Sequence, residues 1–190
     1  FHSMCARWLR VDGSDIGINN DYLIYDDADQ LGVMKRILEE LRVDSRQFTP
    51  RAVLSAISRA KGEGVTAEQF SSRIGGYFEE IVGRAYPRYM AALKKSNALD
   101  FDDLLQQALR LFEESNAALE KYAGRYLFTL VDEFQDTNAT QYALARRLPS
   151  EHKNMCVVGD PDQSIYSWRA ADIRNSEYFL RDFPTATTYL

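Results

Sequence analysis

These 190 residues lack a phosphate-binding loop of the G-x-x-x-x-G-K-[ST] type, and no other glycine-rich loop takes its place. They contain only two cysteines, Cys5 and Cys156, and two histidines, with no CxxC pair and no cluster of metal ligands. Neither a disulfide framework nor a structural metal site is therefore expected. No apolar run approaches the length of a membrane-spanning helix and no signal peptide is visible, so we expect a cytoplasmic protein.

The composition is that of a globular protein, since 45% of the residues are hydrophobic and the formal net charge is only −5. The length suits one domain or two small ones. The acidic balance argues against a surface that binds nucleic acid everywhere, but it is compatible with a local binding groove.

Two short apolar runs, Leu127 to Val131 and Met155 to Val158, are typical of buried β-strands, and each is followed by acidic residues. Between them the sequence predicts a helix, which Thr137 or Asn138 can cap and Pro149 ends. A strand, a helix and a second strand form a βαβ unit, in which the strands are parallel and their carboxyl ends share one edge of the sheet. The polar residues expected to converge at this edge are Asp132, Glu133, Gln135, Asp136, Asp160, Asp162 and Gln163.

An apolar strand that runs into Asp-Glu is how nucleotide triphosphatases present Mg²⁺ to the β- and γ-phosphates. In this interpretation Asp132 holds the metal, directly or through its water shell, and Glu133 polarises the attacking water. The pair alone is equally compatible with an exposed acidic turn at the end of a strand.

A longer pattern favours the first interpretation. The strings DEFQDT, from Asp132 to Thr137, and VVGDPDQSIYSWRAAD, from Val157 to Asp172, closely resemble two conserved blocks of the UvrD/Rep/PcrA family of superfamily 1 DNA helicases. FHSMC at residues 1–5 and LDFDDLL at residues 99–105 also resemble blocks of that family. The resemblance extends over nearly the whole chain and implies an α/β fold, with part of a RecA-like (P-loop NTPase) parallel sheet and a mostly helical inserted subdomain.

The resemblance implies roles for individual residues. Gln163 would contact the γ-phosphate of ATP, Tyr166 and Trp168 would stack on bases of single-stranded DNA, and Arg169 would connect the DNA side to the nucleotide side. Stacking on an aromatic ring binds a base without reading its identity. One departure is Ala170, which stands where the family usually has glycine.

Two further residues are DNA-binding candidates by the same resemblance. His2 lies in a block that contacts the DNA backbone, although a histidine beside Ser3 is as often a structural residue. Phe101 would stack on a base, and the alternative is a core contact in the first turn of a helix capped by Asp100. The cofactors implied are ATP and Mg²⁺, and the partners are single-stranded DNA and a duplex junction.

The resemblance implies that residues 1–20 and 99–190 belong to the first motor domain, and that residues 21–98 form a helical insertion that contacts duplex DNA. Within the insertion the sequence predicts a helix from Thr49-Pro50 to about Gly62 and a longer one from Ile74 to Leu93, which Pro87 should kink or split. The tyrosines on this longer pattern are predicted to be core residues: Tyr77, Tyr86 and Tyr89.

The chain starts at Phe1 without a methionine, and residues 187–190 begin a β-rich run, so both ends are expected to be cut points. We expect an internal fragment of a 3′ to 5′ helicase whose phosphate loop and second motor domain lie outside it. The isolated fragment is expected to be inactive and not to bind ATP and Mg²⁺ tightly. Two alternatives remain: the motor part of a RecB-like or AddA-like helicase-nuclease, and a non-catalytic DNA-binding module.

Overall fold

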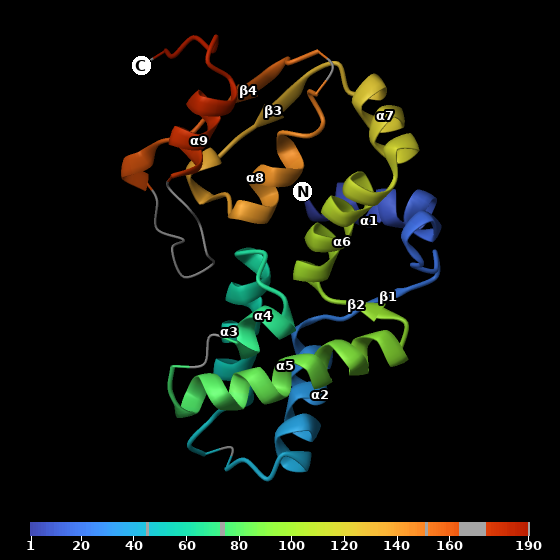
Figure 1. Cartoon of the computed structure of the whole chain (residues 1–190), viewed down its shortest axis with the longest axis vertical. Coiled ribbons are helices and arrows are strands. Elements are labelled where there is room, and N and C mark those ends of the chain that lie inside the picture. Colours follow the sequence, from blue (N-terminus) through green and yellow to red (C-terminus); the bar gives the residue numbers. More distant parts are fainter. Residues whose placement is uncertain (45, 73–74, 151, 164–173, 190) are drawn as a thin grey trace.

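The computed structural model describes residues 1–44, 46–72, 75–150, 152–163 and 174–189 (Figure 1). The chain is mainly helical, with two small parallel sheets in the described part. Its helices are α1 His2–Asp12, α2 Asp27–Glu40, α3 Pro50–Gly62, α4 Ala67–Ser71, α5 Tyr77–Lys95, α6 Phe101–Glu114, α7 Asn116–Arg125, α8 Ala139–Ala145 and α9 Asn175–Asp182. Its strands are β1 Leu23–Ile24, β2 Ala98–Leu99, β3 Thr129–Val131 and β4 Met155–Val157, and its short 3₁₀-helices are η1 Gly13–Ile16, η2 Phe134–Asp136 and η3 Pro161–Gln163.

The predicted βαβ unit is confirmed. Strand β3 pairs in parallel with β4, with Thr129 opposite Met155 and Val131 opposite Val157. Helix α8 connects them and begins at Asn138, which was one of the two predicted caps and forms a capping box with Gln141. Because the strands are parallel, both run toward the same edge, where the acidic residues follow.

The prediction that β3 is a buried strand is wrong for one of its faces. Val131 is buried against Phe134 and Tyr142, whereas Leu130 is 69% exposed and Phe128, just before the strand, is 80% exposed. Successive side chains of a strand point to opposite faces, and in the described residues this sheet has only two strands and one covered face. The apolar run therefore predicted the strand but not which of its side chains are covered.

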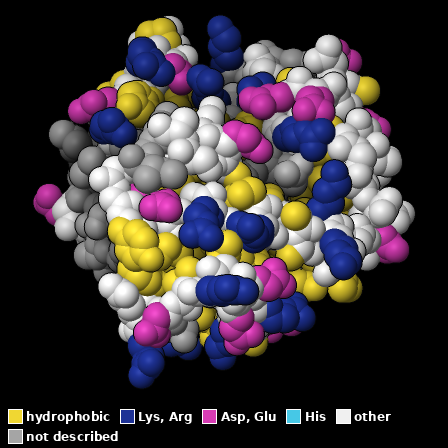
Figure 2. All heavy atoms as spheres, turned by 60° about the horizontal axis from the view of Figure 1, so that its bottom comes forward, with side chains coloured by type: hydrophobic (Ala, Val, Ile, Leu, Met, Phe, Trp, Pro, Cys, Tyr) yellow, Lys and Arg dark blue, Asp and Glu magenta, His cyan; other side chains and the backbone are white. Residues whose placement is uncertain are grey.

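Apart from the small core around Val131, Phe134 and Tyr142, a larger hydrophobic core lies among α2, α3, α4 and α5, which occupy the lower half of Figure 1. Helix α3 begins as predicted, because the Thr49 hydroxyl accepts a hydrogen bond from the Ala52 N–H and Pro50 occupies the first turn. Figure 2 shows that Lys and Arg side chains are interspersed with Asp and Glu over the face that this half presents. The largest fully buried apolar side chains of this core are Met34, Leu38, Ile57, Ile81, Tyr89 and Leu93.

The sequence predicts that Pro87 kinks or splits the longer helix of this region. Splitting does not occur, since α5 is continuous from Tyr77 to Lys95. Proline lacks the N–H that would bond the carbonyl of Gly83, four residues earlier. That carbonyl instead accepts a hydrogen bond from the Ser71 hydroxyl at 3.2 Å. The lost helical bond is replaced from outside α5, so the helix continues.

Two of the three tyrosines predicted to be core residues are buried. Tyr86 and Tyr89 are 2% and 0% exposed, whereas Tyr77 is 65% exposed in the first turn of α5. The prediction is wrong for Tyr77, whose ring packs against the ring of Phe48 at a centroid distance of 5.3 Å.

Within the described residues, no helix is both long enough and apolar enough to span a membrane.

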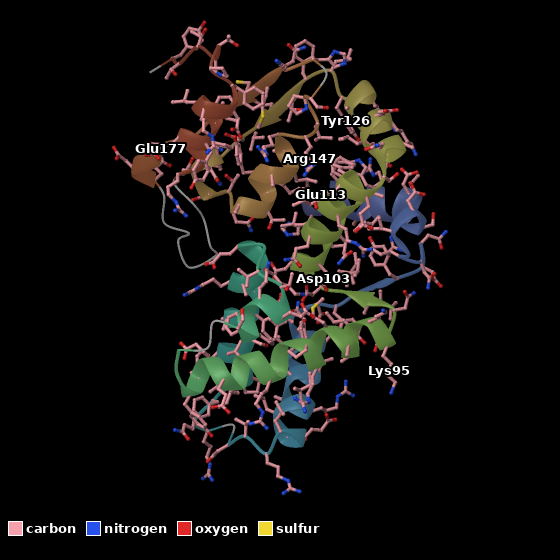
Figure 3. All side chains as sticks on the ribbon, in the orientation of Figure 1. Lys95, Asp103, Glu113, Tyr126, Arg147 and Glu177 are labelled. Atoms are coloured by element: carbon pink, nitrogen blue, oxygen red, sulfur yellow. The ribbon has the colours of Figure 1, made fainter. Side chains whose placement is uncertain are left out.

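A third core joins α1 to α6, α7 and α8. Trp8 lies at its centre, with ring centroids 5.0 Å from Phe112 and 5.2 Å from Tyr122. The contact between Trp8 and Phe112 holds the amino-terminal helix, with His2 in its first turn, against the helix that begins at Phe101. At the other end of α6, Arg147, just after α8, donates a hydrogen bond to Glu113 at 2.6 Å (Figure 3).

A buried ionic cluster lies where the helical core meets α6. The ammonium of Lys61, at the end of α3, is 2.6 Å from both Asp100 Oδ2 and Asp103 Oδ1, and all three residues are at most 2% exposed. Burial by itself would lower the pKa of Lys61, but the charges of Asp103 and Asp100 raise it. The cluster therefore holds a charged lysine inside the protein, a feature that the sequence analysis did not predict.

We expect Asp103 to titrate above the usual range of aspartate. Burial raises the pKa of its carboxyl to about 6, with the Lys61 ammonium opposing the rise and the Asp100 charge adding to it. Because the folded chain then holds this proton more tightly than the unfolded chain, the contribution of Asp103 to the free energy of unfolding decreases as pH rises from about 4 to about 6. The carboxyl carbon resonance of Asp103 should have a midpoint near the upper value, and Asp103→Asn should remove this part of the pH dependence. A midpoint below about 4 would contradict the expectation.

Candidate functional site

The candidate nucleotide-binding edge begins at an unusual turn after β3. Glu133 adopts φ 50° and ψ 45°, a left-handed conformation that side-chain-bearing residues rarely occupy. Its N–H donates to Asp132 Oδ1 at 3.0 Å, and the next N–H, of Phe134, donates to the carbonyl of Val158 at 2.9 Å. The turn therefore remains bonded to the end of β4 while the side chains of Asp132 and Glu133 stay exposed.

The side chain of Gln135 connects the ends of the two strands. It is 3% exposed, its Nε2 donates to Glu133 Oε2 at 2.7 Å, and its Oε1 accepts from the Asp160 N–H at 3.0 Å. A carboxylate would repel Glu133 at this position and an apolar residue would leave the N–H of Asp160 without this acceptor. Gln135 was predicted to lie at this edge, but its role in connecting the two strand ends was not predicted. A glutamine two residues after the acid pair was the available signal.

Asp160 extends the connection to Gln163. Its Oδ2 accepts from Gln163 Nε2 at 2.7 Å and its Oδ1 accepts from the N–H of Asp162 at 3.0 Å. A continuous series of hydrogen bonds therefore leads from Glu133 through Gln135 and Asp160 to Gln163. Asp132, Glu133, Asp160 and Gln163 are all exposed, so a ligand can reach them from solvent.

Asp136 differs from the other acidic residues predicted to converge at this edge. Its Oδ1 is buried and has no hydrogen-bond partner among the described residues. Asp136 lies in the 3₁₀-turn η2 and is half-buried, so it is less accessible from solvent than Asp132 and Glu133.

Gly159, just before Asp160, is a site residue that the sequence analysis missed. A Cβ built at this position would lie 2.5 Å from Gln135 Oε1 and 3.2 Å from the backbone nitrogens of Phe134 and Gln135. Only glycine allows the two strand ends to approach this closely. The signal in the sequence was a glycine between the end of a strand and an acidic residue.

Gly159→Ala is expected to destabilise the chain by about 1–3 kcal/mol, the usual cost of inserting a methyl group into a filled space. Backbone atoms on one side of the new methyl group cannot move without breaking the turn, so the hydrogen bond between Gln135 and Asp160 should be lost. Gly124→Ala in α7 is the matched control, because its added Cβ would meet nothing within 4 Å. The free energy of unfolding by denaturant measures both, and equal small effects would contradict the expected crowding.

The described residues contain no group of three or more His, Cys, Asp or Glu side chains arranged to hold a metal ion. Mg²⁺ in nucleotide sites is usually bound by only one or two carboxylates, together with waters and the phosphates of the substrate. The exposed carboxylates of Asp132 and Glu133 could bind Mg²⁺ in this way, together with waters and phosphate oxygens. The donor set is therefore compatible with magnesium that arrives with a nucleotide.

The two DNA-binding candidates in the described part of the chain lie side by side. The rings of His2 and Phe101 meet edge to face, with centroids 5.9 Å apart and an interplanar angle of 87°. Phe101 is 45% exposed, so the alternative of a core contact is wrong, while His2 is half-buried. The other candidates, Tyr166, Trp168 and Arg169, lie outside the described residues.

Residues 1–184 match the UvrD/REP helicase N-terminal domain family, and the chain belongs to this family. Over 190 residues, all of this chain, it is 47% identical to the ATP-dependent DNA helicase PcrA of Bacillus subtilis (strain 168). Over 188 residues, 99% of this chain, it is 44% identical to the proteins of the same name from Staphylococcus aureus and Staphylococcus epidermidis. In each comparison the match covers 26% of the relative, so the chain spans about a quarter of the length of these proteins.

Proposed function

We propose that this chain is a part of the first motor domain, with its helical insertion, of an ATP-dependent DNA helicase that moves 3′ to 5′ along single-stranded DNA. The complete protein is called the parent helicase below. Membership of the helicase family and the names of the PcrA relatives support the proposal. The observation that carries it is the series of hydrogen bonds from Glu133 through Gln135 and Asp160 to Gln163.

At the nucleotide edge, Asp132 and Glu133 would hold the magnesium ion that accompanies ATP, and its positive charge would neutralise negative charge on the phosphates. Glu133 also accepts a hydrogen bond from the attacking water and orients it, while Gln135 restrains the Glu133 carboxylate through Oε2. Gln163, whose Nε2 donates to Asp160 Oδ2 at 2.7 Å, would contact the γ-phosphate of ATP.

On the DNA side, the exposed ring of Phe101 stacks on a base and His2 contacts the backbone of the same strand. Stacking on one aromatic ring contributes roughly 1–3 kcal/mol and tolerates any base. Tyr166 and Trp168 supply further stacking, and Arg169 connects this track to the nucleotide edge. Residues 1–20 and 99–190 form this motor part, and the helices of residues 21–98 contact duplex DNA ahead of the junction.

The chain by itself is expected to hydrolyse no ATP, because its sequence contains no phosphate-binding loop. The parent helicase should hydrolyse ATP in a reaction that requires Mg²⁺ and is stimulated by single-stranded DNA. A steady-state phosphate-release assay on both proteins, with and without oligothymidylate, tests this. Magnesium-dependent turnover by the chain alone that disappears in Glu133→Gln would contradict the proposed division of the motor.

A further inference from the structure

The buried ammonium of Lys61 joins two parts of the molecule that lie far apart in sequence. Its contacts with Asp100 and Asp103 span 39 and 42 residues, and the hydroxyl of Tyr89 donates to the same Asp100 Oδ2 at 3.0 Å. Lys61 belongs to α3 and Tyr89 to α5, whereas Asp100 caps the start of α6 and Asp103 lies in its first turn (Figure 3, where Asp103 is labelled). The cluster therefore connects the helical core to α6.

Each carboxylate divides its two oxygens between α6 and this cluster. Asp100 caps α6 by accepting from the Asp103 N–H through Oδ1 at 2.8 Å, and Asp103 accepts from the Asp100 N–H through Oδ2 at 3.2 Å. The other oxygens, Asp100 Oδ2 and Asp103 Oδ1, receive the Lys61 ammonium. The capping box that starts α6 is thus held in place by a lysine from another helix.

The end of α3 is fixed to the α6 side by two further contacts. Gln106 Nε2, in α6, donates to the carbonyl of Lys61 at 2.9 Å, and the hydroxyl of Thr140, in α8, lies 3.2 Å from the carbonyl of Gly62. Lys61 is therefore held through both its side chain and its backbone. Its ammonium cannot move without displacing the first turn of α6.

A buried ion cluster of this kind adds little net stability compared with a well-packed apolar group, because each charge loses its hydration. Its directional contacts instead specify one geometry. The residue whose position they specify most directly is Phe101, which lies between the two acids and is the exposed ring that contacts His2. Removing the ammonium would leave two buried carboxylates facing each other and would force the first turn of α6 to rearrange.

We propose that Lys61 is a positioning residue, which sets the Phe101 ring for stacking on single-stranded DNA and couples that ring to the helical core. The inference rests on the proposed function, since it needs Phe101 to contact a base. Because Lys61 is buried, it cannot contact DNA itself. The inference therefore predicts that Lys61 affects DNA affinity only through Phe101.

A double-mutant cycle on the parent helicase tests this, with dissociation constants for a fluorescent oligothymidylate measured without nucleotide. Phe101→Ala should raise the Kd about 5-fold to 150-fold, which corresponds to a stacking energy of roughly 1–3 kcal/mol. Lys61→Met should raise it in the same direction in the normal background and should change nothing further in the Phe101→Ala background. Lys121→Met is the matched control, because it removes another lysine that contacts an aspartate, Asp12 at 2.8 Å, away from the start of α6.

Equal effects of Lys61→Met in both backgrounds would overturn the inference, because the lysine would then act on the whole protein and not through Phe101. An effect of Lys121→Met as large as that of Lys61→Met would overturn it too, by showing a general loss of positive charge. If Phe101→Ala leaves the Kd unchanged, both the DNA role of Phe101 and this inference fail, whereas the ATPase assay still tests the nucleotide edge separately. If Lys61→Met does not fold, Tyr89→Phe, which removes only the hydroxyl that donates to Asp100, replaces it in the same cycle.

Discussion

Replacing Glu133 with glutamine is expected to lower the maximal ATP turnover of the parent helicase about 10²-fold to 10⁴-fold, the range typical of losing a general base. Glutamine has nearly the same shape, and its amide oxygen can still accept the hydrogen bond that Gln135 Nε2 donates to Glu133 at 2.7 Å. It cannot supply the negative charge that attracts a proton of the attacking water. ATP binding, measured with a fluorescent nucleotide, should therefore change little while the rate of phosphate release falls.

Glu177→Gln is the control for this substitution, because Glu177 is an exposed glutamate in the first turn of α9 (Figure 3). It removes the same charge without touching the turn after β3, so turnover should be unchanged. Normal turnover in Glu133→Gln would contradict the assignment of Glu133 as the residue that orients the attacking water.

Replacing Phe112 with alanine is expected to reduce the free energy of unfolding of the chain by about 3–5 kcal/mol. Phe112 is 1% exposed in α6, and its ring packs against both Trp8 at 5.0 Å and Tyr122 at 5.8 Å, measured between ring centroids. Its removal leaves a cavity where α1, α6 and α7 meet, and both aromatic contacts are lost at once. A loss of this size is a large fraction of the stability of a typical domain.

Phe128→Ala is the matched control, since it makes the same chemical change at a side chain that is 80% exposed. It should shift the free energy of unfolding by less than about 0.5 kcal/mol, as surface substitutions usually do. Urea denaturation followed by circular dichroism measures both variants. If both variants lost a similar amount of unfolding free energy, Phe128, just before β3, would have to be covered in solution.

The nucleotide edge was largely predictable because its signals are local. Two apolar runs of strand length, with a capped helix between them, specify a parallel pair, and parallel pairing brings Glu133 and Gln163 to one edge without further information. The hydrogen-bond partners were not predictable, because they depend on the left-handed turn at Glu133 and on the close approach of Gly159 to Gln135.

The errors in the prediction have tertiary causes. Pro87 does not split α5 because a hydroxyl from α4, Ser71, bonds the carbonyl that proline leaves free. Phe128 and Leu130 are exposed because in the described residues only one face of the strand pair is covered. In both cases the local pattern correctly predicts a helix or a strand. Whether the helix continues, or a side chain is covered, depends on a neighbouring element.

By itself the sequence determined the helicase family of this chain, the order of its main elements and the polar groups that meet after β3 and β4. These properties depend on residue types at short spacings, where backbone geometry leaves few choices. Only the tertiary structure decided that Lys61 is buried between Asp100 and Asp103 and that His2 contacts Phe101. Lysines and aspartates are usually exposed, and their burial here depends on packing between helices that are distant along the chain, which no local pattern encodes.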